Sequence, residues 1–109
     1  MSERGDFVTI AMQGDFGKPR PALVIQANQF DQLTTVILLP VTSRLIEAPL
    51  LRITVQPSAK NGLQKPSQVM LDKTLTVKRD KLGPTFGIID ADTMVELERC
   101  LAVFLGIAK

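Results

Sequence analysis

The chain has 109 residues, of which 45% are hydrophobic and 22% are charged, so it is long and apolar enough for one folded domain and is not a disordered chain. It contains no histidine and one cysteine, which excludes histidine catalysis, an internal disulfide and a zinc site built on cysteines. No apolar run approaches the roughly 18 residues of a membrane-spanning helix. The start shows no signal-peptide pattern, and we therefore expect a cytoplasmic protein.

The net charge of +2 is spread unevenly along the chain. Residues 1–89 carry 11 basic and 7 acidic side chains, whereas residues 90–109 carry 2 basic and 4 acidic ones. Residues 44–81 alone hold 8 basic side chains against 3 acidic ones. A basic surface of this kind suits phosphate recognition, but the same bias is typical of a surface that is merely solvated.

The first half of the chain is predicted to form four strands. Four segments are rich in apolar and β-branched side chains and are separated by turn-forming residues: 6–12, 21–27, 34–39 and 50–56. The third of these is almost wholly apolar, which favours a central strand. Gly14, Asp15 and Gly17 predict a loop over residues 13–19.

Two further short strands and a turn are predicted in the second half. Asn61-Gly62, within the proline-containing segment 56–66, indicates a turn or hairpin. Residues 68–71 and 74–77 read as short strands on either side of Asp72-Lys73.

The last segment changes to a helical period. Between Ala91 and Leu105 the apolar residues recur at a spacing of three or four, which predicts a helix. Asp90 or Asp92 is suited to cap its start, and Gly106 stands where a helix ends. Five or six strands followed by one helix predict a single, mainly β domain, a small and strongly bent antiparallel sheet or barrel packed by its C-terminal helix.

Arg20 is the most unusual candidate for a functional residue, because Pro19 and Pro21 flank it. The two prolines restrict the backbone and neither can donate to a sheet, so Arg20 is expected at the edge where a strand begins. A guanidinium on such a stiff backbone is well suited to hold a phosphate, since it stays charged and binds two oxygens at once. An ordinary arginine in a proline-bracketed turn is the alternative.

Two other positions carry weaker signals. Thr42 and Ser43 follow the apolar third strand and precede Arg44, so two hydroxyls and a cation can meet a phosphate there; a turn capped by hydroxyls is the alternative. Asp72 follows an apolar triplet at a strand end, where a carboxylate can act as a base or bind a base edge. A turn aspartate paired with Lys73 is the alternative.

Taken together, four segments in this order resemble the MazF/PemK (Kid) toxins of toxin–antitoxin systems. They are Arg4-Gly5-Asp6-Phe7-Val8, Lys18-Pro19-Arg20-Pro21-Ala22-Leu23-Val24-Ile25, Pro40-Val41-Thr42-Ser43 and the ending Leu101-Ala102-Val103-Phe104-Leu105-Gly106. The resemblance spans nearly the whole chain. It implies an SH3-like β-barrel with a terminal helix, a homodimer, and a metal-independent endoribonuclease without cofactors that cuts single-stranded RNA and is inhibited by a cognate antitoxin.

The resemblance also assigns roles to residues. The family's catalytic arginine and threonine map onto Arg20 and Thr42, while Lys18, Ser43 and Asp72 are predicted substrate contacts. The implied reaction uses the 2′-hydroxyl of the RNA itself as nucleophile and gives a 2′,3′-cyclic phosphate and a 5′-hydroxyl, which suits a chain without histidine.

The chain departs from the family pattern around these residues. The loop at 13–19 is shorter than usual and lacks the Glu-Gln or histidine of many members, with Asp15 as a weak substitute. Met70 and Leu75 stand where members carry arginines, so either Asp72 or Asp15 is left to assist proton transfer.

Two other function classes remain open from the sequence. One is a toxin on the same fold that resembles CcdB and poisons DNA gyrase through its terminal helix, for which the apolar ending at Phe104 and Leu105 is suited. The other is an SH3-like binding module without catalysis. Arg20-Pro21 and Thr42 favour the nuclease.

Overall fold

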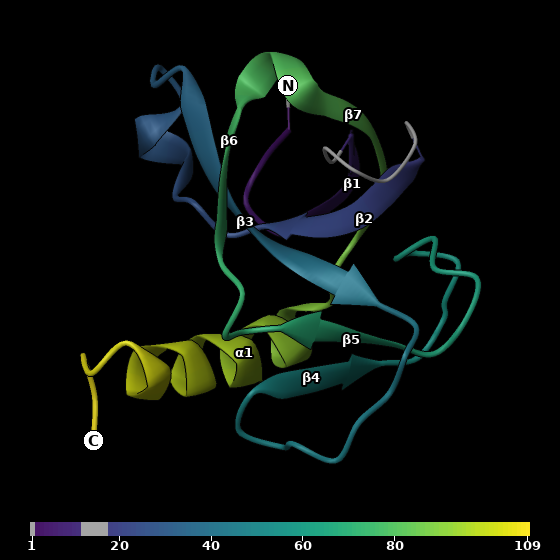
Figure 1. Cartoon of the computed structure of the whole chain (residues 1–109), viewed down its shortest axis with the longest axis vertical. Coiled ribbons are helices and arrows are strands. Elements are labelled where there is room, and N and C mark those ends of the chain that lie inside the picture. Colours follow the sequence, from purple (N-terminus) through teal and green to yellow (C-terminus); the bar gives the residue numbers. More distant parts are fainter. Residues whose placement is uncertain (1, 12–17) are drawn as a thin grey trace.

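A computed structural model of the chain describes residues 2–11 and 18–109. Seven strands and one α-helix account for most of these residues (Figure 1). The elements are β1 (Asp6–Ala11), β2 (Pro19–Val24), β3 (Thr35–Thr42), β4 (Arg52–Val55), β5 (Ser67–Met70), β6 (Leu75–Lys78), β7 (Leu82–Ile88) and α1 (Ala91–Phe104), with short 3-10 helices η1 (Asn28–Phe30) and η2 (Arg79–Lys81).

The strands form one antiparallel sheet in the order β4-β5-β3-β2-β1-β7, with β6 also paired to β3. Residues 35–38 of β3 pair with β6 and residues 41–42 pair with β5, so both of these strands lie along β3 and a turn over residues 71–74 separates them. The predicted central position of the apolar third strand is therefore confirmed. Among the described residues no ladder joins β6 to β7, so the bent sheet does not close into a complete barrel.

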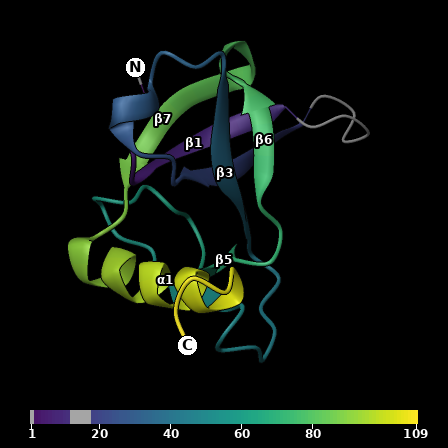
Figure 2. The same ribbon diagram turned by 90° about the vertical axis from the view of Figure 1, so that its left-hand side faces the viewer.

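The sheet bends so strongly that it encloses two hydrophobic clusters. In Figures 1 and 2, β3 runs from an upper part that holds β1, β2, β6 and β7 into a lower part where β4 and β5 lie beside α1. The strand β1 contributes to both clusters, since Phe7 packs in the cluster that includes α1 while Val8 and Ile10 pack in the other. The alternation of side chains along a strand explains this division.

The helix α1 matches the prediction in position and caps. Met94 and Leu97 are its buried residues, and the carboxylate of Asp90 accepts a hydrogen bond from the backbone N–H of Thr93 at 3.1 Å. Hydrogen bonds from the side chain and backbone of Thr93 hold the pKa of Asp90 below its ordinary value. Gly106, with φ of 76°, follows the helix in the left-handed region that terminates helices. No helix in the described part of the chain is long and apolar enough to span a membrane.

The main error of the sequence interpretation concerns β7, which was not predicted. Its sequence, LGPTFGI, contains two glycines and a proline, which interrupt the usual strand pattern. The strand forms because it lies at the edge of the sheet beside β1, where two register shifts accommodate the irregular sequence. Two strand boundaries also differ from the prediction. The strand β3 continues through Pro40 to Thr42 instead of ending at Leu39, and β2 begins at Pro19 instead of Pro21.

The hairpin at Asn61-Gly62 is confirmed, because β4 and β5 pair antiparallel across it.

Candidate active site

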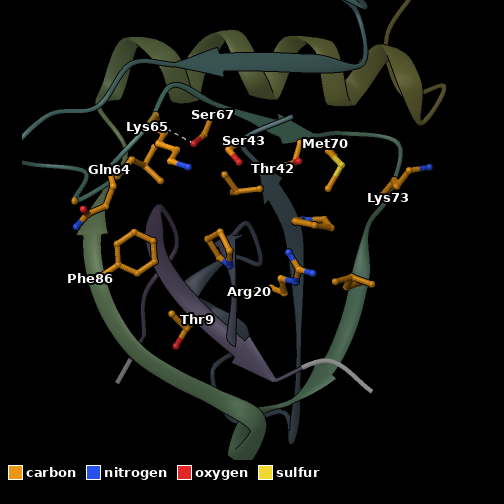
Figure 3. A pocket seen from close by; sticks show the side chains of 16 residues that line it. Thr9, Arg20, Thr42, Ser43, Gln64, Lys65, Ser67, Met70, Lys73 and Phe86 are labelled. Carbon is orange, nitrogen blue, oxygen red and sulfur yellow. Dashed lines mark hydrogen bonds between the residues drawn. The ribbon is translucent and has the colours of Figure 1, made fainter. Parts of the chain in front are cut away.

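A cavity of about 770 Å³ opens beside the end of β3, between the β4–β5 hairpin and the strands β2 and β7 (Figure 3). Its described lining residues include three cations and four hydroxyls but no carboxylate. The polar lining residues are Thr9, Arg20, Thr42, Ser43, Gln64, Lys65, Ser67 and Lys73. The other lining residues are Pro21, Pro40, Val41, Gly62, Leu63, Met70, Leu75 and Phe86. Such a surface suits an anion that also carries apolar groups.

Arg20 reaches the cavity from the second residue of β2, opposite Ile10 of β1. Arg20 stands at a strand start, as predicted, but the strand includes both flanking prolines and so begins two residues before the predicted start at Pro21. The side chain is exposed where it lines the cavity. A guanidinium on an extended and restricted backbone is therefore presented to whatever occupies the cavity.

Thr42 is the last residue of β3 and pairs with Gln68 of β5. Its hydroxyl accepts a hydrogen bond from the backbone N–H of Arg44 at 3.1 Å, which fixes the orientation of the side chain. A hydroxyl can accept and donate at the same time, so the O–H of Thr42 can still donate to a phosphate oxygen. The turn capped by a hydroxyl, an alternative from the sequence, is thus present and compatible with a role in the site.

The segment after Thr42 is tied to the sheet by the buried side chain of Gln68. The amide oxygen of Gln68 accepts from the backbone N–H of Ile46 at 3.0 Å, and its nitrogen donates to the carbonyl of Ile46 at 3.0 Å. The same nitrogen donates to the hydroxyl of Thr54 at 3.2 Å. These contacts hold the chain where it leaves β3 and so stabilise the position of Ser43 beside Thr42.

Asp72 lies outside the set of cavity-lining residues and forms an ion pair with Arg52. Lys73 is a second, looser partner, with Nζ at 3.7 Å from the carboxylate. Partial burial disfavours the ionised carboxylate, but the hydrogen bond and charge of Arg52 and the charge of Lys73 outweigh it and lower the pKa of Asp72. Asp72 is therefore a charged carboxylate at neutral pH that is already engaged by two cations.

The structure thus brings Arg20, Thr42 and Ser43 to one cavity. Lys18 is exposed and, like Asp72, does not line it. Asp15 lies outside the described residues. The pairing of Asp72 with Lys73, the alternative from the sequence, is present, but no sequence pattern indicated Arg52, because 20 positions separate it from Asp72.

Several lining residues were not selected from the sequence. Met70 and Leu75, which replace arginines of the resembled family, lie on the cavity surface, and Lys65 and Lys73 supply cations nearby. Lys65 belongs to the β4–β5 hairpin, and the only hint of its position was the turn signal at Asn61-Gly62. Phe86 lies on β7, a strand that no pattern in the sequence indicated. Within residues 2–11 and 18–109, no three side chains of the His, Cys, Asp and Glu types cluster as a metal site.

Comparison with known proteins gives a consistent result. A family model of PemK-like, MazF-like toxins of type II toxin–antitoxin systems matches residues 3–105. The probable endoribonuclease MazF of Mycolicibacterium smegmatis is 44% identical over 106 residues, which cover 96% of this chain and 97% of that protein.

Similar folds occur among solved structures. An endoribonuclease of a mycobacterial species, solved in complex with its cognate antitoxin, superposes with a TM-score of 0.85 and 23% identity, covering 100% of this chain and 99% of that one. The Mycobacterium tuberculosis toxin MazF-mt6 has a TM-score of 0.78 and 26% identity, covering 94% of this chain and 99% of that one. The MazE–MazF structure from Deinococcus radiodurans (Form-II) has a TM-score of 0.79 and 24% identity, with 98% and 97% covered.

Proposed function

Because the chain belongs to the PemK/MazF family of toxins of type II toxin–antitoxin systems, we propose that it is a metal-independent endoribonuclease that cleaves single-stranded mRNA at short sequences. The 44% identical relative is a probable endoribonuclease. The observation that carries the proposal is the cavity that Arg20 and Thr42 share with two lysines and with no described carboxylate. This lining favours the polyanionic backbone of RNA.

In the proposed reaction the RNA supplies its own nucleophile. The 2′-oxygen of one nucleotide forms a bond to the neighbouring phosphorus as the bond from phosphorus to the 5′-oxygen of the next nucleotide breaks. The 2′-hydroxyl loses its proton and the departing 5′-oxygen gains one, which gives a 2′,3′-cyclic phosphate and a 5′-hydroxyl. Arg20 stabilises the additional negative charge on the phosphate, and the hydroxyl of Thr42 donates to it and assists proton transfer.

The remaining polar groups would hold the RNA around this centre. Ser43, Lys65 and Lys73 lie on the cavity surface and are suited to bind the scissile and flanking phosphates. Lys18 and Asp72 stay predicted substrate contacts. The ion pair with Arg52 gives Asp72 a structural role as well, so its contribution to binding has to be separated from its effect on stability.

We also propose that the protein forms a two-fold homodimer and binds an antitoxin. The end of α1 and the tail after it lie at one end of the molecule, below β3 and β6 (Figure 2). Four apolar side chains of this segment are exposed: Val103, Phe104, Leu105 and Ile107. Exposed apolar side chains that are close together in the chain are typical of a protein–protein interface. An acidic, initially disordered antitoxin segment would compete with RNA for the cationic cavity. Sedimentation at micromolar concentration tests the dimer, and a 12 kDa monomer that cleaves RNA would contradict it.

The function itself is tested by incubating the purified protein with a long single-stranded RNA in EDTA. We expect cleavage at a limited set of sites, with 5′-hydroxyl ends that accept label from a polynucleotide kinase without prior dephosphorylation. Arrest of DNA gyrase without RNA cleavage would instead support the CcdB-like alternative. If the protein neither cleaves RNA nor arrests gyrase, the remaining alternative is an SH3-like binding module without catalysis.

A further inference from the structure

The wall of the cavity that faces Lys73 is built by the β4–β5 hairpin, and the buried side chain of Asn61 holds this hairpin in place. Asn61 is only 6% exposed. Its amide oxygen accepts from the backbone N–H groups of Ser58 at 3.0 Å and Leu63 at 2.9 Å, and its amide nitrogen donates to the carbonyl of Gln56 at 2.8 Å. One side chain therefore fixes the turn from both ends, directly before the cavity-lining Leu63 and Gln64.

The same turn packs against β7 without space for a side chain. Gly62 has a φ of 69°, and a Cβ there would collide with the carbonyl oxygen of Phe86, while a Cβ on Gly87 would collide with the carbonyl of Asn61. The backbone N–H of Ile88 also donates to the carbonyl of Lys60 at 2.9 Å. The hairpin and β7 therefore form one rigid wall, which is what a specificity site requires.

Phe86 supplies the aromatic part of this wall. Its ring stacks on the fully buried ring of Phe7, with centroids 6.0 Å apart and an interplanar angle of 26°. Phe86 itself is half-buried and contributes to the cavity surface beside Leu63. It is the only aromatic side chain among the described cavity-lining residues. A phosphate gains nothing from such an apolar surface, whereas a nucleobase stacks on it.

Gln64 supplies the polar part. In Figure 3, Gln64 and Phe86 lie on one side of the cavity, Met70 and Lys73 lie on the other, and Arg20 stands between them. The side chain of Gln64 is exposed, and its amide offers both a donor and an acceptor. This pairing is suited to the edge of an unstacked base.

We propose that Leu63, Gln64 and Phe86 form a base-specificity subsite for the nucleotide next to the scissile phosphate. The base stacks on Phe86, Gln64 hydrogen-bonds to its edge, and Asn61 is a positioning residue. This inference rests on the proposed endoribonuclease function. It gives two parts of the cavity different tasks, since Arg20 and Thr42 act on the phosphate and the side with Gln64 and Phe86 selects the base.

The test is to map every cut that wild type, Gln64→Ala, Gln64→Glu and Phe86→Leu make in one long single-stranded RNA, with thermal unfolding as a fold control. Gln29→Ala and Phe30→Leu are matched controls, because both residues are exposed on η1 and neither lines the cavity. We expect Gln64→Ala to lose the base preference at one position flanking the cut while it still cleaves, and Gln64→Glu to shift that preference. Phe86→Leu should raise KM about tenfold, and the controls should cut like wild type.

The outcomes separate the two proposals. If wild type cleaves and both Gln64 variants cut the same sites with the same base frequencies, the subsite is wrong and the nuclease proposal stands. If wild type does not cleave the RNA, both proposals fail. Because Gln64 is exposed, its variants are informative even if Phe86→Leu unfolds.

Discussion

Two arginines of this chain, Arg20 and Arg52, have the same chemistry and opposite surroundings. The side chain of Arg52 is only 9% exposed, and it donates to the carbonyl of Leu51 at 3.1 Å and to the carboxylate of Asp72. The side chain of Arg20 is exposed on the cavity at the start of β2. Arg52 thus holds β4 to the turn that follows β5, whereas Arg20 is presented to a ligand.

This difference shows why a count of positive charges does not locate a binding surface. Of the basic residues between 44 and 81, Lys65 and Lys73 line the cavity. Arg52 is engaged by Asp72, and Arg79 donates to the carbonyls of Leu33 and Phe30 at 2.7 and 3.4 Å. The basic segment is therefore partly a structural feature and partly a candidate RNA surface.

The largest effect is expected from Arg20→Ala. The rate of RNA cleavage should fall by about 10²–10³, because the phosphate loses a charge-stabilising group at the transition state. The melting temperature should stay close to that of wild type, since Arg20 lies exposed at a strand end. Single-turnover cleavage and thermal unfolding measure the two quantities. Arg20→Lys should also cleave RNA much more slowly, because an ammonium does not reproduce the planar, bidentate geometry of the guanidinium. Full cleavage activity in a folded Arg20→Ala variant would show that Arg20 is not part of the active site.

Thr42→Val tests the hydroxyl with little change in shape. We expect Thr42→Val to cleave RNA about 10- to 100-fold more slowly, because the phosphate loses one hydrogen bond to a charged group. Thr42→Ser keeps the hydroxyl and should retain part of the activity in the same cleavage assay. Equal cleavage by wild type and the valine variant would mean that Thr42 only caps the turn through its contact with Arg44.

Asp72→Asn is expected to act mainly on stability, in contrast to Arg20→Ala. It leaves a largely buried Arg52 without a carboxylate and should cost about 2 kcal/mol in the free energy of unfolding at neutral pH. Because the folded-state pKa of Asp72 is lowered, the ion pair stabilises the fold above the ordinary aspartate pKa.

The pH dependence of the stabilisation by the Asp72–Arg52 ion pair provides a control for the Asp72→Asn experiment. The stabilisation should begin to fall as the pH drops below the ordinary aspartate pKa and should disappear below the lowered pKa, so the stabilities of wild type and Asp72→Asn should approach each other in acid. Chemical unfolding at pH 7 and in acid measures this difference. If Asp72→Asn keeps wild-type stability at pH 7 but loses cleavage, Asp72 is a substrate contact and the contrast between the two arginine environments is wrong.

The smallest effects are expected for Lys65→Ala and Lys73→Ala. Each should reduce the slope of log affinity against log salt by about 0.7 for single-stranded RNA. Lys60→Ala is the control, since Lys60 is exposed on the same hairpin and does not line the cavity. The slopes are obtained from RNA binding at several salt concentrations, with each lysine substitution made in the Arg20→Ala variant so that the RNA is not cleaved. If Lys65→Ala, Lys73→Ala and Lys60→Ala all give the same slope, the two cavity lysines do not contact phosphates.

The sequence predicted those features that depend on neighbouring residues. The strands β1 to β6, the turn at Asn61-Gly62 and the capped helix follow from local periodicity and turn chemistry. The Pro19–Pro21 pattern also identified Arg20 as a residue at a strand start. Its position on the cavity is known only from the structure.

Features that depend on tertiary contacts could not be predicted in this way. The strand β7 forms because β1 offers it an edge, although its glycines and proline oppose a strand. The ion pair of Asp72 with Arg52 and the contact of Gly62 with Phe86 join positions 20 or more residues apart. Both need the folded sheet before they exist, and both shape the surroundings of the cavity.

The most direct test of the central claim is mass spectrometry of the products formed from one defined oligonucleotide in EDTA, with and without a 2′-deoxy nucleotide at the cleavage position. If the cavity of Arg20 and Thr42 promotes attack by the RNA's own 2′-hydroxyl, the all-ribose substrate gives a 2′,3′-cyclic phosphate and a 5′-hydroxyl, and the 2′-deoxy substrate stays intact. Cleavage of the 2′-deoxy substrate at the same position, or a 5′-phosphate product, would contradict this mechanism.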